Sequence, residues 1–291
     1  MPTLLDFRRR IRSVKNTQQI TRAMKFVSAA QLRRAQETAL AARPYARELA
    51  RVLRSTMSRI AEPQHALLAH RPEERILAIV LSGERGLAGA FNANILRKAN
   101  DFFRTHRGKR LSVIAVGKKG RDSLKKAGFN IIAEYVNVLA RVNFATAREI
   151  ATLVTELYAK EEMDSVYIVF SEFKTVVTSN LVVEKLLPVE AVREEEPSSS
   201  AQASSQVDYI YEQPETQLLD KLLPRYIETQ LLRAMLESSA AEHAARMTAM
   251  ESATKNAGDV IEALTLHMNK VRQAAITKEI IEIVSGASST A

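Results

Sequence analysis

Two long stretches that almost lack helix-breaking residues, one at each end of the chain, most constrain the fold. Residues 3–58 contain one proline, Pro44, and no glycine, and residues 215–284 are interrupted only by Pro224 and Gly258. Glycine and proline are the residues that destabilise a helix most. Apolar residues in the first stretch recur at steps of three and four, which is the helical period. Each stretch is therefore predicted to form one long helix, spanning about 80–105 Å.

The apolar stripe of each predicted helix needs a partner. The C-terminal stretch shows the four-three spacing of a coiled-coil seam, at Ala257, Ile261, Leu264, Met268, Val271 and Ala275. A compact middle domain would be only about 30 Å across, too small to cover both stripes. We therefore predict that the two helices pair antiparallel, with residue 58 near 212 and residue 2 near 268. The last ~20 residues would then extend without a partner.

Residues 76–188 have a different character. Three short β-branched runs, ILAIVLS, LSVIAVG and VYIVFSEF, indicate buried strands, and IIAEYV and NLVVEKLLP are weaker strand candidates. Helical stretches at Ala90–His106, Lys118–Ala127 and Asn143–Glu161 alternate with them. The predicted fold class is α/β: a long antiparallel coiled coil of the N- and C-terminal helices plus a small Rossmann-like α/β domain with a mostly parallel sheet.

The predicted organisation has five parts. They are an N-terminal coiled-coil helix (1–59), a connector (60–75), the α/β domain (76–188), a flexible Ser-rich loop (189–208) and a C-terminal coiled-coil helix (209–291). The loop is polar and acidic, a composition that does not support a packed core.

Charge is distributed unevenly along the chain. The net charge is +9, and residues 1–60 hold 14 Lys or Arg and 3 Asp or Glu, a balance of +11, so the remainder sums to −2. We expect the excess positive charge to lie on this one helix. The two interpretations are a solvated basic face, or a face that meets nucleic acid, anionic lipid or acidic protein. The chain has no cysteine, which excludes disulfides and thiolate metal sites.

One motif resembles a phosphate-binding loop. Residues 82–92 (SGERGLAGAFN) follow a strand and open a helix. Their spacing is G-x-x-G-x-x-G and not the dinucleotide fingerprint G-x-G-x-x-G, and Asp101 lies in the following helix instead of after the next strand. We interpret the loop as a tight turn with close packing. The five histidines show no zinc spacing, so we predict no catalytic residue, no cofactor and no metal site.

Four blocks of the sequence resemble the gamma subunit of bacterial F-type ATP synthases. They are RRRIRSVKNTQQITRAMKFVSAAQLRRAQ at 8–36, SGERGLAGAFNANI at 82–95, DYIYEQPETQLLDKLLPRYIETQL at 208–231, and ARMTAMESATKNAGDVIEALTLHMNKVRQAAITKEIIEIVSGA at 245–287. The blocks occur in order along the whole chain.

The resemblance implies a central rotor shaft with no catalytic residue of its own. Its partners would be three alpha and three beta subunits, the epsilon subunit and the membrane-embedded c-ring, and it would lie peripherally on the cytoplasmic face of the cell membrane without spanning it. The family pattern implies alpha- and beta-subunit contacts at Gln18, Thr21, Met24, Lys25, Arg33, Arg34, Arg246, Lys270, Arg272, Gln273 and Thr277. It implies a foot on the c-ring at Tyr209, Tyr211 and Glu212, and an apolar sleeve around Ile280–Ala287. The family often carries Ser-Asp and Cys in the glycine loop where this chain has Gly83-Glu84 and Ala88, so the role of Glu84 is left open.

Two alternatives remain at this point. The first is a basic coiled-coil scaffold that binds nucleic acid, although no aromatic residues interleave with the cations of residues 8–34 beyond Phe26 and no known reading motif appears. The second is a small α/β enzyme with a ligand at residues 83–92.

Overall fold

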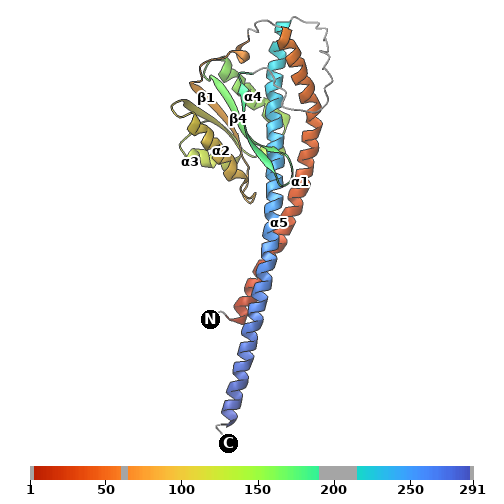
Figure 1. Cartoon of the computed structure of the whole chain (residues 1–291), viewed down its shortest axis with the longest axis vertical. Coiled ribbons are helices and arrows are strands. Elements are labelled where there is room, and N and C mark those ends of the chain that lie inside the picture. The colour runs from red at the N-terminus through yellow and green to blue at the C-terminus, as the bar shows by residue number, and fades with distance from the viewer. Residues whose placement is uncertain (1–2, 60–64, 190–214, 289–291) are drawn as a thin grey trace. The chain divides into compact units, whose positions relative to one another are not determined.

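The computed structural model describes residues 3–59, 65–189 and 215–288 (Figure 1). The chain divides into two compact units, Met1–Ala29 with Arg246–Ala291, and Ala30–Ala245. The elements are α1 (Leu4–Arg59), η1 (Ala66–Leu68), β1 (Arg75–Leu81), α2 (Phe91–Thr105), β2 (Arg110–Val116), α3 (Lys118–Lys126), β3 (Asn130–Tyr135), η2 (Leu139–Arg141), α4 (Phe144–Ala159), β4 (Ser165–Phe173), β5 (Ser179–Leu187) and α5 (Glu215–Ser288). Residues 60–64, the centre of the predicted connector, and 190–214, most of the predicted Ser-rich loop, lie outside the described residues.

The two long helices exist as predicted. α1 has 56 residues and continues through Pro44, and α5 has 74 residues and continues through Pro224. A reciprocal cap begins α1: the Thr3 backbone N–H donates to Asp6 Oδ2 at 2.9 Å, and the Asp6 N–H donates to Thr3 Oγ1 at 3.3 Å. This arrangement satisfies donors that the first turn of a helix leaves unpaired.

In the first unit, the ends of α1 and α5 pair antiparallel. Phe7 stacks against His267 with ring centroids 5.0 Å apart, and Thr21 contacts Thr254. The predicted register placed residue 7 opposite 263, so it was wrong by four residues, about one helical turn. The predicted register started from an assumed pair, residue 58 near 212, and an error in that starting pair carries along both helices. From Ile276 to Ser285 every side chain is exposed, which confirms the unpaired end of α5.

In the second unit, a five-stranded sheet has the order β3-β2-β1-β4-β5. The first four strands run parallel, and β5 pairs antiparallel with β4. All five predicted strands are present, including the two weaker candidates. β1 is fully buried from Ile76 to Leu81, since helices cover both of its faces.

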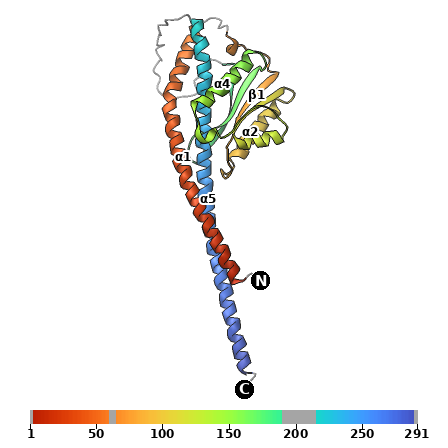
Figure 2. The same ribbon diagram turned by 180° about the vertical axis from the view of Figure 1, so that it is seen from behind.

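The two faces of the sheet have different covers (Figures 1 and 2). On one face, α4 packs with the C-terminal part of α1 and the N-terminal part of α5 around a core that includes Leu53, Tyr158 and Leu223. On the other face, α2 and α3 pack over a smaller core that includes Ile95, Phe103 and Leu124. The outward surfaces of α2 and α3 therefore remain open.

Candidate subunit-contact surface

A belt of polar residues, Lys15–Gln19 with Thr21 and Arg22, interrupts the apolar stripe of α1, and two of them, Gln18 and Thr21, bind α5 in the first unit. Gln18 Nε2 donates to the backbone oxygen of Thr254 at 3.3 Å, and Thr21 Oγ1 lies 2.8 Å from Thr254 Oγ1. Gly258 provides the room for this contact, since a Cβ there would lie 3.3 Å from Gln18 Nε2. Lys25 Nζ pairs with Glu251 Oε1 at 2.6 Å. The belt is thus a hydrogen-bonded layer within the helix pair.

These internal contacts change how three predicted contact residues are interpreted. Thr21 is buried, and Gln18 and Lys25 are half-buried, so much of their surface already faces α5. Met24 is also half-buried, and Arg246 is buried with an interaction of its own within the chain. Their predicted contacts with another subunit stay predictions, and only the remaining exposed part of each side chain is available for them.

The outer surface of α1 combines apolar and basic side chains. Ile20, Phe26 and Val27 are about 60% exposed (60%, 61% and 57%), although burial is the usual state for such residues. In the second unit, Arg33 and Arg34 are exposed, and Arg33 Nε reaches only its neighbour Glu37, at 3.0 Å. Large exposed apolar side chains such as those of Ile20, Phe26 and Val27 are typical of a surface that another protein covers.

The unpaired end of α5 has the same character. Lys270, Arg272, Gln273 and Thr277 are all exposed, and the Thr277 hydroxyl donates to the Gln273 backbone oxygen. Further along, four apolar side chains are between 55% and 72% exposed: Ile280, Ile281, Ile283 and Val284. In this chain nothing among the described residues covers them.

The glycine loop sends the side chain of Glu84 to the N-terminus of α3. The carboxylate of Glu84, which is buried, accepts the backbone N–H of Lys118 at 3.1 Å and that of Val138 at 3.1 Å. Lys118 is the first residue of α3, so a side chain of this chain already occupies the anion position at that helix N-terminus. Gly83 donates to Asn92 Oδ1 at 2.8 Å, which ties the loop to α2. The structure supports the tight-turn interpretation.

Neither a metal cluster nor a membrane span occurs in the described ranges. No group of three or more His, Asp or Glu side chains there could hold a metal ion. No described helix is long and apolar enough to cross a bilayer.

Comparison with known proteins identifies the family. The family model described as ATP synthase matches residues 3–290. The "ATP synthase gamma chain" of Solibacter usitatus is 49% identical over 292 residues, covering 99% of both chains. That of Pelotomaculum thermopropionicum is 47% identical, again with 99% of each chain covered. The chain belongs to the ATP synthase gamma-chain family.

Solved structures show the same fold at greater distance. A chain of the Euglena gracilis mitochondrial ATP synthase superposes with a TM-score of 0.67 at 19% identity, covering 99% of this chain and 94% of that one. A chain from the Tetrahymena thermophila central stalk and c-ring assembly gives a TM-score of 0.60 at 23% identity, covering 80% and 99%.

The predicted foot on the c-ring falls between β5 and α5 in the sequence. The three predicted foot residues, Tyr209, Tyr211 and Glu212, lie outside the described residues. The described chain stops at Val189 and resumes at Glu215, so only the flanks of the predicted foot are positioned.

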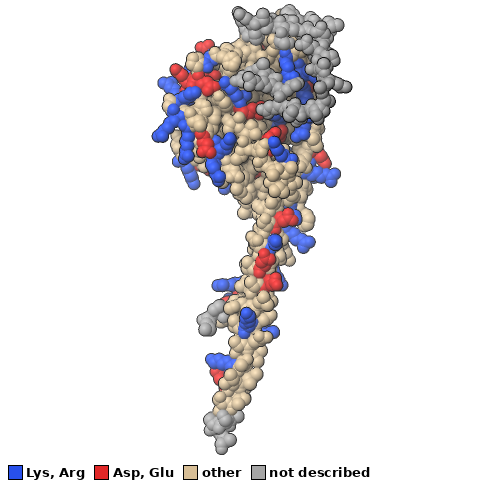
Figure 3. Space-filling view, in the orientation of Figure 1, with Lys and Arg blue, Asp and Glu red and all other residues tan. Residues whose placement is uncertain are grey.

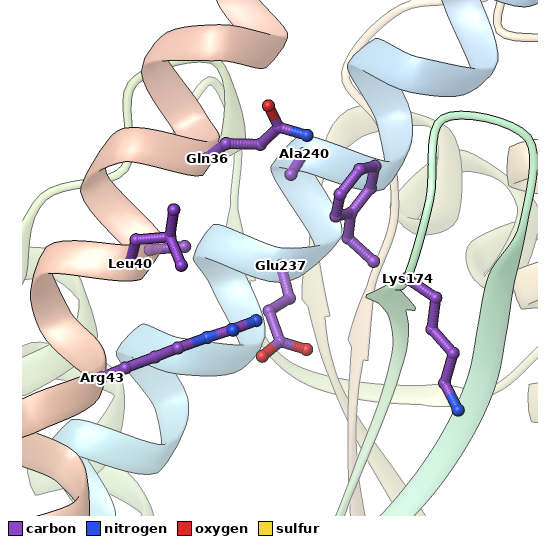
Figure 4. Close-up of a pocket in the computed structure, with 8 residues that line it drawn as sticks. Gln36, Leu40, Arg43, Lys174, Glu237 and Ala240 are labelled. Carbon is purple, nitrogen blue, oxygen red and sulfur yellow. The ribbon is translucent and has the colours of Figure 1, made fainter.

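Sequence reasoning missed a buried acid between the long helices in the second unit. Glu237 of α5 is 8% exposed and lines a cavity of about 320 Å³ together with Gln36, Leu40 and Arg43 of α1 and Lys174 (Figure 4). Burial raises its pKa, an effect that Arg233 and Arg43 oppose. Helical periodicity gave no signal, because Glu is common on solvated faces and this one is buried by segments distant in sequence, α1 and the end of β4.

A second basic region was also missed. Residues 91–130 contain eleven Lys or Arg and two Asp or Glu, a balance of +9. The expectation that the excess charge lies on one helix is therefore wrong. Acidic residues elsewhere in residues 61–291 offset the positive charge of this region. The net charge of −2 over that whole range therefore concealed it.

Proposed function

We propose that this chain is the central rotor shaft of a proton-translocating F-type ATP synthase. It would transmit torque between a membrane-embedded ring and a catalytic hexamer of alpha and beta subunits, and would itself be non-catalytic. The observation that carries the proposal is full-length similarity to gamma chains at up to 49% identity among the relatives compared. The nucleic-acid scaffold receives no support from these matches.

The surfaces described above suit this role. A shaft has to stay rigid while its outer surface meets different subunits in turn. The seam that joins Gln18, Thr21 and Thr254 contributes internal rigidity. The exposed apolar end of α5 and the outer face of α1 supply surface that a surrounding hexamer could cover. The ring contact and the place on the cytoplasmic face of a bacterial membrane are part of the same proposal.

Reconstitution with alpha and beta subunits tests the proposal directly. The chain should copurify with both, activate ATP hydrolysis, and rotate when a bead is attached to its α/β unit. A chain that assembles with neither subunit would overturn the proposal.

Charge reversal on α1 tests the contact residues. Arg33→Glu with Arg34→Glu places like charge against an acidic partner surface, which costs affinity and coupling. We expect slower, poorly coupled ATP-driven rotation while the catalytic sites still bind nucleotide. The matched control is Arg141→Glu with Lys160→Glu, two exposed cations of the α/β unit with the same total charge change. Equal rotation in the two variants would contradict the assignment of Arg33 and Arg34.

A further inference from the structure

The outward layer formed by α2, α3 and the turn between α2 and β2 is strongly basic. We call it the basic layer. Its cations are Arg97, Lys98, Arg104, Arg107, Lys109, Arg110, Lys118, Lys119, Arg121, Lys125 and Lys126. All of them except Arg121 are exposed. Figure 3 shows Lys and Arg side chains gathered over α2 and α3.

Most of these cations are not neutralised within the chain. Among the described residues, seven have no ion-pair partner: Arg97, Lys98, Arg107, Arg110, Lys118, Lys119 and Lys126. The other four meet Asp101, Asp122, Glu73 or Glu134. A solvated helix surface usually intersperses both signs of charge, so this layer is an uncompensated positive surface.

The layer lacks the features of a specific protein interface or a nucleic-acid reader. Every large apolar side chain of α2 and α3 is buried or half-buried, so no exposed anchor exists there. Protein interfaces normally have such an apolar centre. The aromatic residues Phe102, Phe103 and Phe129 pack in or against the core beneath, where they cannot stack on bases. The layer therefore best suits a negatively charged partner that needs only diffuse positive charge, without an apolar anchor or base stacking.

Several of the cations lie at one edge of the sheet. Arg110 begins β2 opposite Arg75, the first residue of β1, and Arg107 precedes it in the turn after α2. Lys126 ends α3, just before β3 begins. Parallel strands place all these positions at the amino edge of the sheet.

The flanks of the predicted ring contact lie at the same edge. The described chain stops at Val189, whose backbone N–H donates to Leu67, just after β5 ends opposite the start of β4. Near the start of α5, Asp220 pairs with His65 of the segment that leads to β1, at 3.4 Å. The basic edge is therefore on the same side of the domain as Val189 and the start of α5, the described residues that flank the predicted foot in the sequence.

We propose that the basic layer binds the anionic headgroups of the membrane leaflet beneath the rotor. This inference deepens the proposed function and rests on it for the nearness of a membrane. A fluid leaflet is laterally uniform, so it attracts the layer equally at every angle and sets up no rotational stop. A fixed acidic protein would hold the shaft at one angle. The layer thus draws the rotor toward its ring without opposing rotation.

Vesicle flotation of the full chain measures the interaction. The probes are vesicles of phosphatidylcholine alone and vesicles with 30% phosphatidylglycerol added. We expect binding only to the anionic vesicles, weakening as salt rises. Each cation near an anionic surface is worth about fivefold in partition, so Arg107→Gln with Arg110→Gln and Lys126→Gln should lower binding by roughly 100-fold.

The basic N-terminal part of α1 provides the matched control. Arg8→Gln with Arg12→Gln and Arg22→Gln removes the same charge from exposed positions in the other unit and should cost far less vesicle binding.

Circular dichroism checks that each variant folds. Arg97→Gln with Lys98→Gln and Lys119→Gln is a second layer variant if the first misfolds. Equal losses in the layer and α1 variants, equal binding to neutral vesicles, or preference for duplex DNA over anionic vesicles would overturn the inference. Vesicle binding needs no alpha or beta subunit, so its failure is distinguishable from failure of the rotor proposal.

Discussion

Replacement of Gly117 by alanine should destabilise the α/β unit strongly, because the backbone just after β1 occupies the space that a side chain would need. Gly117 lies between β2 and α3 with φ of +99°. A Cβ there would lie 1.9 Å from the backbone oxygen of Ser82, which follows β1. No choice of rotamer relieves this clash, since the backbone alone positions both atoms.

The expected loss of stability combines the backbone strain at residue 117 with the hydrogen bonds that the displacement weakens. The left-handed backbone costs an alanine about 1–2 kcal/mol. Displacing Gly117 or Ser82 weakens two hydrogen bonds, from the Gly117 N–H to the Tyr135 oxygen and from the Gly120 N–H to Ser82 Oγ, both 2.7 Å long. Each is worth about 1 kcal/mol. The total is about 3–4 kcal/mol, a large share of a typical stability of 5–15 kcal/mol.

Urea denaturation followed by circular dichroism measures the loss, and two other glycines separate its causes. Gly128 has φ of +77° and no atom within 4 Å of the point where a Cβ would lie, so Gly128→Ala carries only the backbone strain, about 1–2 kcal/mol. Gly86 has neither feature, and Gly86→Ala should change stability by less than about 0.5 kcal/mol. If Gly117→Ala costs no more than Gly128→Ala, the close approach of Ser82 is not restrictive and the reasoning is refuted.

Three further predictions concern single side chains. Glu84→Ala leaves the backbone N–H groups of Lys118 and Val138 without their acceptor and should cost about 2–5 kcal/mol in urea denaturation; a loss below about 1 kcal/mol would mean that water replaces the carboxylate. The hydrogen bond from Arg75 holds the pKa of Asp164 below its usual value, so the carboxylate stabilises the fold above about pH 4 and this contribution disappears as the pH falls through the folded pKa. Asp164→Asn should therefore be less stable at about pH 7 and approach the parent below about pH 4, and a constant gap across a pH series of urea midpoints would contradict this. Pro44→Ala restores a backbone donor inside α1 and should raise the stability by up to about 3 kcal/mol, visible as a higher Tm; an unchanged Tm would show that the surrounding helix already compensates for the proline.

Much of the fold was predictable because its signals are local. Helical periodicity and the scarcity of glycine and proline depend only on neighbouring residues, and they marked α1 and α5 correctly. The buried β-branched runs marked the parallel strands in the same way. The register between α1 and α5 was wrong by about one turn, since it started from one assumed pair of neighbouring residues and an error there shifts every other pair.

The surface was less predictable than the fold. Only the structure shows that Gln18 and Thr21 of the polar belt bond to Thr254. A charge count over residues 61–291 as one block concealed the basic layer, which a count over residues 91–130 alone reveals. Resemblance to a family supplied the candidate contact residues, and the structure divided them into exposed and internally bonded groups.

The sequence by itself determined two long amphipathic helices, their antiparallel pairing, a mostly parallel sheet in the residues that connect them, and membership of the gamma-chain family. The helices, their pairing and the strands follow from residue patterns within single segments. Family membership follows from similarity along the whole chain. Tertiary structure alone decided that Glu84 caps α3 from 34 residues away and that α1 helps to bury Glu237. It also decided that the cations of α2 and α3 share one open face. The physical reason is that burial and electrostatic environment depend on which distant segments pack together, and no local pattern encodes that choice.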